Sequence, residues 1–380
     1  MAIAIGVVMM LVSFATGLGL QEKIRDKIAA FNGHINISNY DNNSSQVTLT
    51  PVDKNQEFYP EFNKVEGIAH VQAVATKFGI IRTETDFEGV IVKGVGTDYN
   101  WNYFKDFLVE GELPNVDDKL NDEVLISSYL ANRLQLNVGD KIPTYFLRDG
   151  SERPLTRGFV ITGIYDSGFM EFDKLYVLAD IRHIQRLNRW EENQVGNFEV
   201  FLNDFNEIDK KGQEVYENTG SFLDTQTITQ TYYSIFEWLA LFDFNIALII
   251  GIMILVAGIN MITALLVLIL ERTQMIGILK ALGGNDWSIR KIFLYNAGYL
   301  IIKGLFWGNL IGLGLLLLQK YFKLVPLDPS TYYVTEVPVY LNWDYILAVN
   351  LGTLVLCMLM LIIPSIIISK ISPSRAIKFE

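Results

Sequence analysis

Four apolar runs of bilayer length constrain this chain more than any other feature. They cover Met1 to Leu20, about Ile246 to Leu270, about Ala297 to Leu318 and about Ile346 to Ile368. Each is close to the roughly 20 residues that a helix needs to cross the hydrocarbon core of a bilayer. Charged residues make up only 19% of the chain, against about 25% in an average soluble domain. The sequence therefore predicts a membrane protein with four transmembrane helices.

The first run differs from a secretory signal peptide. It lacks the basic start and the small-residue cleavage site that such a peptide needs, so we interpret it as a membrane anchor. It also begins without a cytoplasmic flank, and we expect residues to be missing before Met1.

An acidic block separates the first two runs. Residues 21–237 hold 35 of the 42 acidic and 21 of the 31 basic residues, a net charge of −14, whereas the rest of the chain carries +3. The overall charge of −11 argues against a nucleic-acid binder held by a basic surface. The single cysteine, Cys357, excludes a disulfide within the chain, and His34, His70 and His183 are too scattered to indicate a metal site.

Positive charges set the predicted orientation. They lie between the second and third runs and after the fourth run, at Arg272, Lys280, Arg290, Lys291, Lys370, Arg375 and Lys378. Such stretches are typical of the cytoplasmic side. The N-terminus and C-terminus are therefore expected inside, with the acidic block and the 319–345 loop on the opposite side.

Two helices are expected to extend beyond the membrane as stalks. After the first run, Leu20, Ile24, Ile28 and Phe31 recur at helical spacing, and Gly33 ends the pattern. Before the second run, residues 229–245 contain neither Pro nor Gly. If residues 229–270 form one helix, it spans about 63 Å, twice the hydrocarbon thickness. The alternative is a frayed linker, which the unbroken periodicity disfavours.

The acidic block alternates strand and helix patterns, which is typical of an α+β domain. Strands are expected at His34–Ser38, Gln46–Thr50, Gly89–Val95, Glu123–Ile126, Lys141–Leu147, Phe159–Tyr165, Leu175–Leu178 and Asn197–Leu202. Helices are expected at Ser127–Leu134, Ala179–Asn188 and Phe205–Asn218. An Asp-Gly pair at 149–150 indicates a hairpin tip. Arg182, Arg186 and Arg189 follow helical spacing and predict a solvated face rather than a phosphate site.

No residue pattern for catalysis is present. The sequence has no Gly-x-Ser-x-Gly elbow, no His-Glu-x-x-His zinc helix and no Gly-x-x-x-x-Gly-Lys-Ser/Thr phosphate loop. We therefore expect no enzyme activity, no bound cofactor and no metal. If ATP powers this protein, another chain must bind it.

The membrane runs carry signals for helix packing. Gly304, Gly308 and Gly312 recur at every fourth residue, a spacing that lets helix backbones approach closely, although scattered glycines are common in apolar helices. Asn260 and Asn350 are expected to bond neighbouring helices rather than to line a pathway. With so few polar groups in the runs, an ion channel or a proton-coupled carrier is disfavoured.

The stretch between the second and third runs predicts a short amphipathic helix. Ile276, Leu279 and Leu282 would form its apolar face, Gly283-Gly284 suits its C-terminus, and Asn285 or Asp286 can cap a next helix starting at Trp287. From physical arguments alone, such a helix would lie on the lipid surface.

Several segments resemble one family of transporters. The stretch at 269–283 reads ILERTQMIGILKALG and is similar to the ATPase-coupling helix of FtsX-like, MacB-type ABC permeases. AGIN at 257–260, YYVTEVPVYLNW at 332–343 and the tail with Pro364 and PSRAI at 373–377 extend the resemblance. Within this superfamily, EVLISSYLANRLQLNVGDKI at 123–142 and ITGIYDSGFMEFDKLYVLADIRHIQRL at 161–187 most resemble the lipoprotein-releasing (Lol-type) permeases. Met275 departs from the pattern, because many members carry Glu there.

The resemblance implies a domain arrangement along the chain. A large α+β extracytoplasmic domain lies between helices 1 and 2, carried on helical stalks. The expected segments are 1–32 (helix 1 and stalk), 33–228 (MacB-like periplasmic domain), 229–270 (stalk and helix 2), 271–293 (coupling loop), 294–318 (helix 3), 319–345 (periplasmic loop), 346–368 (helix 4) and 369–380 (tail).

The resemblance also implies a function. It is that of a permease subunit in the bacterial inner membrane, which couples ATP hydrolysis by a separate ATPase, with its ATP and Mg, to the release of lipoproteins. The coupling helix would comprise Met275, Ile276, Gly277, Ile278, Leu279, Lys280, Ala281, Leu282 and Gly283. A hairpin hook for a periplasmic chaperone would comprise Tyr145, Phe146, Asp149, Gly150 and Pro154. Further expected partners are a second permease, as a homodimer or heterodimer, and membrane lipids.

Two alternatives remain open at this point. One is a mechanotransmission permease that regulates a cell-wall hydrolase or drives efflux. The other is a membrane-anchored receptor, which the short cytoplasmic segments disfavour, because they are too small for a signalling domain.

Overall fold

The computed structural model describes residues 1–43, 45–117, 119–147 and 154–370. The chain forms two compact units. The helical unit contains Met1–Glu22, Glu237–Leu327 and the described chain from Glu336 onward, and the mixed unit contains Lys23–Phe236 and Asp328–Thr335. The predicted 319–345 loop is thus divided, because its central segment packs with the mixed unit.

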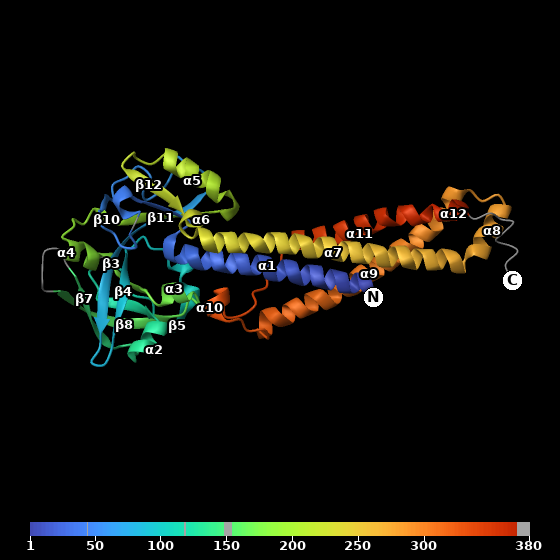
Figure 1. Ribbon diagram of the computed structural model, residues 1–380. Coiled ribbons are helices and arrows are strands. Elements are labelled where there is room, and N and C mark those ends of the chain that lie inside the picture. Colours follow the sequence, from blue (N-terminus) through green and yellow to red (C-terminus); the bar gives the residue numbers. More distant parts are fainter. Residues whose placement is uncertain (44, 118, 148–153, 371–380) are drawn as a thin grey trace. The chain divides into compact units, whose positions relative to one another are not determined.

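Four helices in the described residues are long and apolar enough to cross a membrane. They are α1 (Ala2–Asn32), α7 (Tyr233–Glu271), α9 (Asp286–Phe322) and α11 (Trp343–Ser365), which α12 (Ile367–Lys370) follows (Figure 1). The 39 residues of α7 correspond to about 58 Å of helix, against about 30 Å of hydrocarbon. The predicted four membrane-spanning segments are confirmed by length and composition.

The prediction of one helix over residues 229–270 is wrong at its start. A short helix, α6 (Ile228–Thr231), precedes α7, and Tyr232 lies between them with a non-helical backbone. Thr227 caps α6 through a capping box with Gln230, so this turn is stabilised independently of α7. The Tyr232 hydroxyl donates to Asn32 Oδ1 at 3.2 Å, so its side chain is bound at the end of α1.

A ten-stranded sheet of the described residues forms the centre of the mixed unit. Its order is β12-β1-β11-β3-β4-β9-β6-β8-β5, and β7 pairs with β3 and β8. The strands are β1 (Ile35–Asn39), β3 (Ile68–Arg82), β4 (Phe87–Val95), β5 (Leu108–Gly111), β6 (Glu123–Ser127), β7 (Lys141–Phe146), β8 (Leu155–Tyr165), β9 (Tyr176–Asp180), β11 (Asn197–Leu202) and β12 (Leu223–Thr227). β2 (Val52–Asp53) and β10 (Gln194–Val195) form a separate pair.

Short helices complete the mixed unit. They are α2 (Ser128–Leu134), α3 (Met170–Asp173), α4 (Ile181–Asn188), α5 (Ile208–Glu217) and α10 (Pro329–Tyr332) (Figure 1). Most neighbouring strands are antiparallel, but β4 pairs with β9 and β6 with β8 in parallel. This mixture of strands and helices agrees with the predicted α+β class.

Three local predictions are wrong. Residues 46–50 form no strand, because the backbone amides of Leu49 and Thr50 donate to Asn42 Oδ1 rather than to a neighbouring strand. The helix expected from Ala179 begins at Ile181, because Asp180 ends β9 and its carboxylate caps α4. The helix expected from Phe205 begins with a 3₁₀ turn, and α5 proper starts at Ile208.

Candidate functional site

The segment between α7 and α9 contains the short helix α8 (Thr273–Ala281). A non-helical backbone at Arg272 separates it from α7. Beyond it, Gly283 adopts the left-handed conformation, with φ of +90°, which glycine reaches without steric cost. Asn285 then caps α9 by accepting from the Trp287 amide at 3.2 Å. The sequence thus encodes a helix, a turn and a new helix within 15 residues.

The apolar face predicted for α8 is divided between the chain's own core and the exposed surface. Ile276 is fully buried in the same apolar cluster as Ile289 of α9, and Leu279 packs against that cluster. Met275, Ile278 and Leu282 are instead 38%, 47% and 80% exposed. These three residues, which we name the α8 outer face, are three and four positions apart and lie on one side of a helix. Of the predicted face, Ile276 and Leu279 thus pack in the chain's own core, and Leu282 is exposed.

Lys280 is engaged within the chain. Its Nζ lies 2.9 Å from Asp286 Oδ1 and donates to the carbonyls of Ile368 and Ser369 at 2.8 and 3.1 Å. The side chain is only 9% exposed. These contacts join α8, the start of α9 and α12, so Lys280 positions the α8 outer face.

The three glycines of α9 all face α1. A Cβ at Gly304, Gly308 or Gly312 would lie 2.7–3.2 Å from a side-chain atom of Ile3, Val7 or Leu11, respectively. Any larger side chain would therefore force the two helices apart.

The predicted interhelical role of Asn350 is confirmed, whereas that of Asn260 is not. Asn350 exchanges side-chain hydrogen bonds with Asn309 at 2.6 and 3.0 Å, which joins α11 to α9. Asn260 donates to the Val256 carbonyl of its own helix. This bond satisfies one N–H of the Asn260 side chain within α7.

The hairpin of β7 and β8 occupies the position of the expected hook. Tyr145 pairs with Thr156, and Phe146 pairs with Leu155. Phe146 is fully buried, so its side chain is unavailable to a chaperone, whereas Pro154 is exposed. Asp149 and Gly150 lie outside the described residues.

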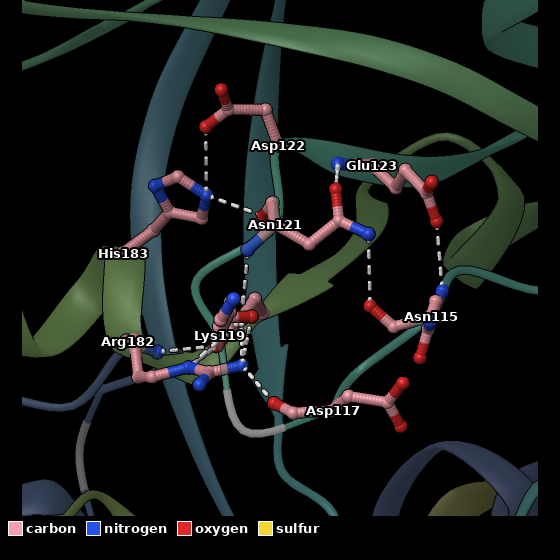
Figure 2. A network of polar contacts seen from close by, with 9 residues as sticks. Asn115, Asp117, Lys119, Asn121, Asp122, Glu123, Arg182 and His183 are labelled. Carbon is pink, nitrogen blue, oxygen red and sulfur yellow. Dashed lines mark hydrogen bonds and ion pairs between the residues drawn. The ribbon is translucent and has the colours of Figure 1, made fainter.

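Arg182 is a loop anchor rather than part of a solvated face, which corrects the sequence prediction. Figure 2 shows its guanidinium directed at the loop before β6, where it donates to the carbonyls of Asp117 and Lys119 at 2.5 and 2.7 Å and also pairs with Asp180. His183 Nε2 lies 2.8 Å from the Asn121 carbonyl. Burial lowers the pKa of His183, so the neutral ring is favoured in this network.

A buried ion pair escaped the sequence analysis. Lys93 Nζ and Glu199 Oε1 lie 2.6 Å apart in the centre of the sheet, with side-chain exposures of 1% and 3%. Burial lowers the pKa of Lys93 and raises that of Glu199, while each charge opposes the effect on the other. The available signal was a charged residue within each of two largely apolar stretches, GVIVKGV and NFEVFL.

Two family models together match most of the chain. Residues 1–215 match the MacB-like periplasmic core domain, and residues 247–373 match the FtsX-like permease C-terminal model. The first match alone covers more than half of the chain. It includes α1 and the strands through β11, and the second includes α8 and the last two membrane helices.

Curated relatives are similar over most or all of the chain. The lipoprotein-releasing system transmembrane protein LolC of Haemophilus influenzae is 26% identical over 269 residues, which cover 68% of this chain and 64% of that protein. LolC of Xylella fastidiosa (strain 9a5c) and LolC of Buchnera aphidicola are 19% and 22% identical, each over 100% of this chain and 92% of the relative.

A solved structure also aligns with the chain. The extracellular domain of the ABC-type transporter YknZ from Gram-positive bacteria aligns over 51% of this chain and 99% of that domain, at 14% identity and a TM-score of 0.35. The family itself follows from the sequence matches. Since the MacB-like model spans residues 1–215 and the FtsX-like model spans residues 247–373, the chain belongs to the FtsX-like, MacB-type ABC transporter permeases.

Proposed function

We propose that this chain is the permease subunit of an ABC transporter that extracts lipoproteins from the bacterial inner membrane and releases them on the periplasmic side. The proposal is supported by relatives named LolC at 19–26% identity. In it, the mixed unit is periplasmic and α8 is cytoplasmic. A second permease copy or a related chain completes the membrane part.

The energy for release comes from a separate ATPase subunit that binds ATP and Mg. Pulling an acyl chain out of the bilayer costs about 0.8 kcal/mol per CH₂ group, so several chains require tens of kcal/mol. Passive binding cannot supply so much, because non-covalent affinities reach only about 20 kcal/mol. The sequence contains no phosphate loop, so we assign nucleotide binding to the partner.

The α8 outer face is the observation that carries this proposal. Met275, Ile278 and Leu282 are exposed on a helix whose opposite side is buried and whose Lys280 is bound within the chain. A helix held in this way can transmit displacement, because it cannot shift without moving α9 and α12. We infer that the ATPase docks on this face and that nucleotide-driven closure moves the attached membrane helices.

The test is co-purification in detergent with ABC-type ATPase subunits from the same cells, followed by an ATP-dependent lipoprotein release assay in proteoliposomes. Leu282→Asp and Ile278→Asp place a charge in the docking face and are expected to reduce both association and release at least tenfold. Phe222→Asp is the matched control, because Phe222 is an equally exposed apolar residue (82%) in the mixed unit. If both α8 variants retain association and release, docking at this face is refuted.

The second candidate is a mechanotransmission permease that regulates a cell-wall hydrolase or drives efflux. The match of residues 1–215 to a MacB-like domain favours it as much as it favours lipoprotein release. Cross-linking of the mixed unit in cells distinguishes the two. A peptidoglycan hydrolase or an efflux duct among the cross-linked partners would replace the lipoprotein assignment, whereas lipoproteins or their chaperone would support it.

A further inference from the structure

The end of α1 is bound to the sheet through polar groups. The Phe31 carbonyl accepts from Lys93 Nζ at 2.7 Å, and the Ala30 carbonyl accepts from the Tyr99 hydroxyl at 3.3 Å. Gly33 then leaves the helix with φ of +67°. The last carbonyls of a helix have no partners within it and carry its negative dipole end, so a buried ammonium is well matched to them.

The Lys93 ammonium is itself held on the sheet. Its Nζ lies 2.6 Å from Glu199 Oε1, and Gln72 donates to the other carboxylate oxygen at 2.9 Å. The side-chain oxygen Oε1 of Gln72 in turn accepts from the backbone amide of Asn100 at 2.9 Å. Strands β3, β4 and β11 therefore all contribute to one network that ends on α1.

The residue that precedes the second long helix is bound at the same point. Asn32, the last residue of α1, accepts from Tyr232, the residue between α6 and α7. The Phe31 ring packs against Phe104 and Phe172, with centroids 5.2 and 4.7 Å apart, and the side chain is 2% exposed. The end of α1 and the residue that precedes α7 thus meet within the mixed unit.

Stability alone does not explain the ion pair. Replacement of a buried pair by apolar residues of similar volume is often neutral or stabilising, because desolvation offsets the attraction between the charges. Apolar contacts are non-directional, so an apolar junction would let the helix end slide or rotate on the sheet. A hydrogen-bonded pair has one favourable geometry and resists both motions.

We propose that Lys93 and Glu199 are positioning residues that fasten the end of α1 to the sheet, so that displacement of this helix moves the mixed unit with it. The inference rests on the proposed function, in which motion at α8 must reach the domain that handles the substrate. The pair contacts neither nucleotide nor lipoprotein. It acts by keeping the junction rigid.

The test uses the double variant Lys93→Met/Glu199→Gln in the full permease–ATPase complex. It removes both charges together, so no unpaired charge remains and the fold is expected to survive. Two readouts are measured. Amide hydrogen exchange over residues 28–33 should accelerate at least tenfold, and ATP-dependent release should fall at least tenfold while ATPase activity stays within twofold of wild type. Release within twofold of wild type in a folded double variant would overturn the proposal.

Two further variants keep the proposal falsifiable. Tyr99→Phe removes one hydroxyl from the junction and leaves the ion pair, and we expect a two- to fivefold loss of release at unchanged ATPase activity. If the double variant does not fold, unchanged release in Tyr99→Phe overturns the proposal. Lys211→Met/Glu214→Gln is the matched control, because it removes a 2.7 Å pair on α5 and should change neither readout.

The two readouts separate this inference from the proposed function. Hydrogen exchange needs only the purified full chain in detergent, without ATPase or substrate. Suppose that the wild-type complex releases no lipoprotein but that amide hydrogen exchange over residues 28–33 is faster in the double variant. The proposed function is then refuted, whereas the role of Lys93 and Glu199 in fastening α1 is supported. If wild type releases lipoprotein and the double variant shows wild-type hydrogen exchange over residues 28–33, only the role assigned to Lys93 and Glu199 is refuted.

Discussion

Each compact unit contains a lysine whose amine binds an acid and at least one backbone carbonyl of a helix. Lys93 in the mixed unit binds Glu199 and the Phe31 carbonyl, and Lys280 in the helical unit binds Asp286 and the carbonyls of Ile368 and Ser369. The acid partners differ in environment. The side chain of Glu199 is 3% exposed, whereas that of Asp286 is 46% exposed.

This difference predicts unequal energetic consequences for the same chemistry. Removing one partner of a buried pair leaves an uncompensated charge in a low-dielectric interior. Removing one partner of a pair that reaches water leaves a charge that solvent can stabilise. Because both lysines bind a carboxylate and helix carbonyls, the comparison tests how much burial of the carboxylate adds to the energy of such a site.

The largest effect is expected for Lys93→Met alone. The Glu199 carboxylate would lose its partner inside the sheet, and we expect a loss of about 3–5 kcal/mol in the free energy of opening of β4 and β11. Amide hydrogen exchange of these strands, followed by mass spectrometry, measures this quantity. A loss below about 1 kcal/mol would show that water reaches Glu199 and would remove the distinction between the two lysines.

The deficit of Lys93→Met should depend on pH. Burial already raises the pKa of Glu199 in the presence of Lys93, and without the ammonium it rises further. The folded variant then binds a proton that the unfolded chain does not, so its deficit relative to wild type should shrink by up to about 1.4 kcal/mol per pH unit as the pH falls from 7 to 5. A deficit that stays constant over this range would mean that Glu199 binds no additional proton in the folded variant. It would contradict a carboxylate that is buried in the variant and ionised in wild type.

His34 is a buried titratable side chain that is bound by a backbone amide rather than by a charged group. Its Nδ1 accepts from the Leu202 amide at 2.8 Å, and burial lowers its pKa to about 4. The unfolded chain therefore binds a proton below about pH 6.5 that the folded chain excludes, and stability is lost as the pH falls from 6.5 towards 4. We expect about 1–3 kcal/mol from this group.

The readout for His34 is the difference in stability between wild type and His34→Asn across this pH range. Burial raises the pKa of Asp173 to about 6, so its contribution has the opposite sign and is lost as the pH rises. That contribution is common to both proteins and cancels in the difference. A pH-independent difference would contradict the assignment to His34.

The smallest effect is expected for Lys280→Met. Asp286 stays hydrated after its ion pair with Lys280 is lost, and the carbonyls of Ile368 and Ser369 lose a donor, so we expect about 1 kcal/mol or less. Hydrogen exchange should increase over residues 366–369 and remain unchanged in β4 and β11. An effect as large as that of Lys93→Met would mean that the hydrogen-bond pattern, rather than burial, sets the energy.

The membrane helices and the short helix α8 were predictable because their signals are local. An apolar run of about 20 residues has few alternatives to a spanning helix, and Gly283 with Asn285 marks the turn that separates α8 from α9. The orientation of α8 was less predictable. Ile276 and Ile278 are equally apolar, and only packing against Ile289 distinguishes the buried one from the exposed one.

In the mixed unit, the missed elements have weak local patterns. β3 runs for 15 residues with apolar side chains on both faces, so the alternation that identifies a half-buried strand is lost. β12 reads LDTQT and is polar, yet it pairs with β1 along its length. Residues 46–50 have a strand-like composition, but the amides of Leu49 and Thr50 donate to Asn42.

The sequence by itself determined the four spanning helices, the mixed class of the domain and the family, because each depends on composition, spacing or extended similarity along the chain. Only the tertiary structure decided which residues of α8 face outward and that Lys93 meets Glu199 at the end of α1. The physical reason is distance along the chain. Lys93 and Glu199 are 106 residues apart, and their pairing depends on the order of strands in the sheet, which no local pattern encodes.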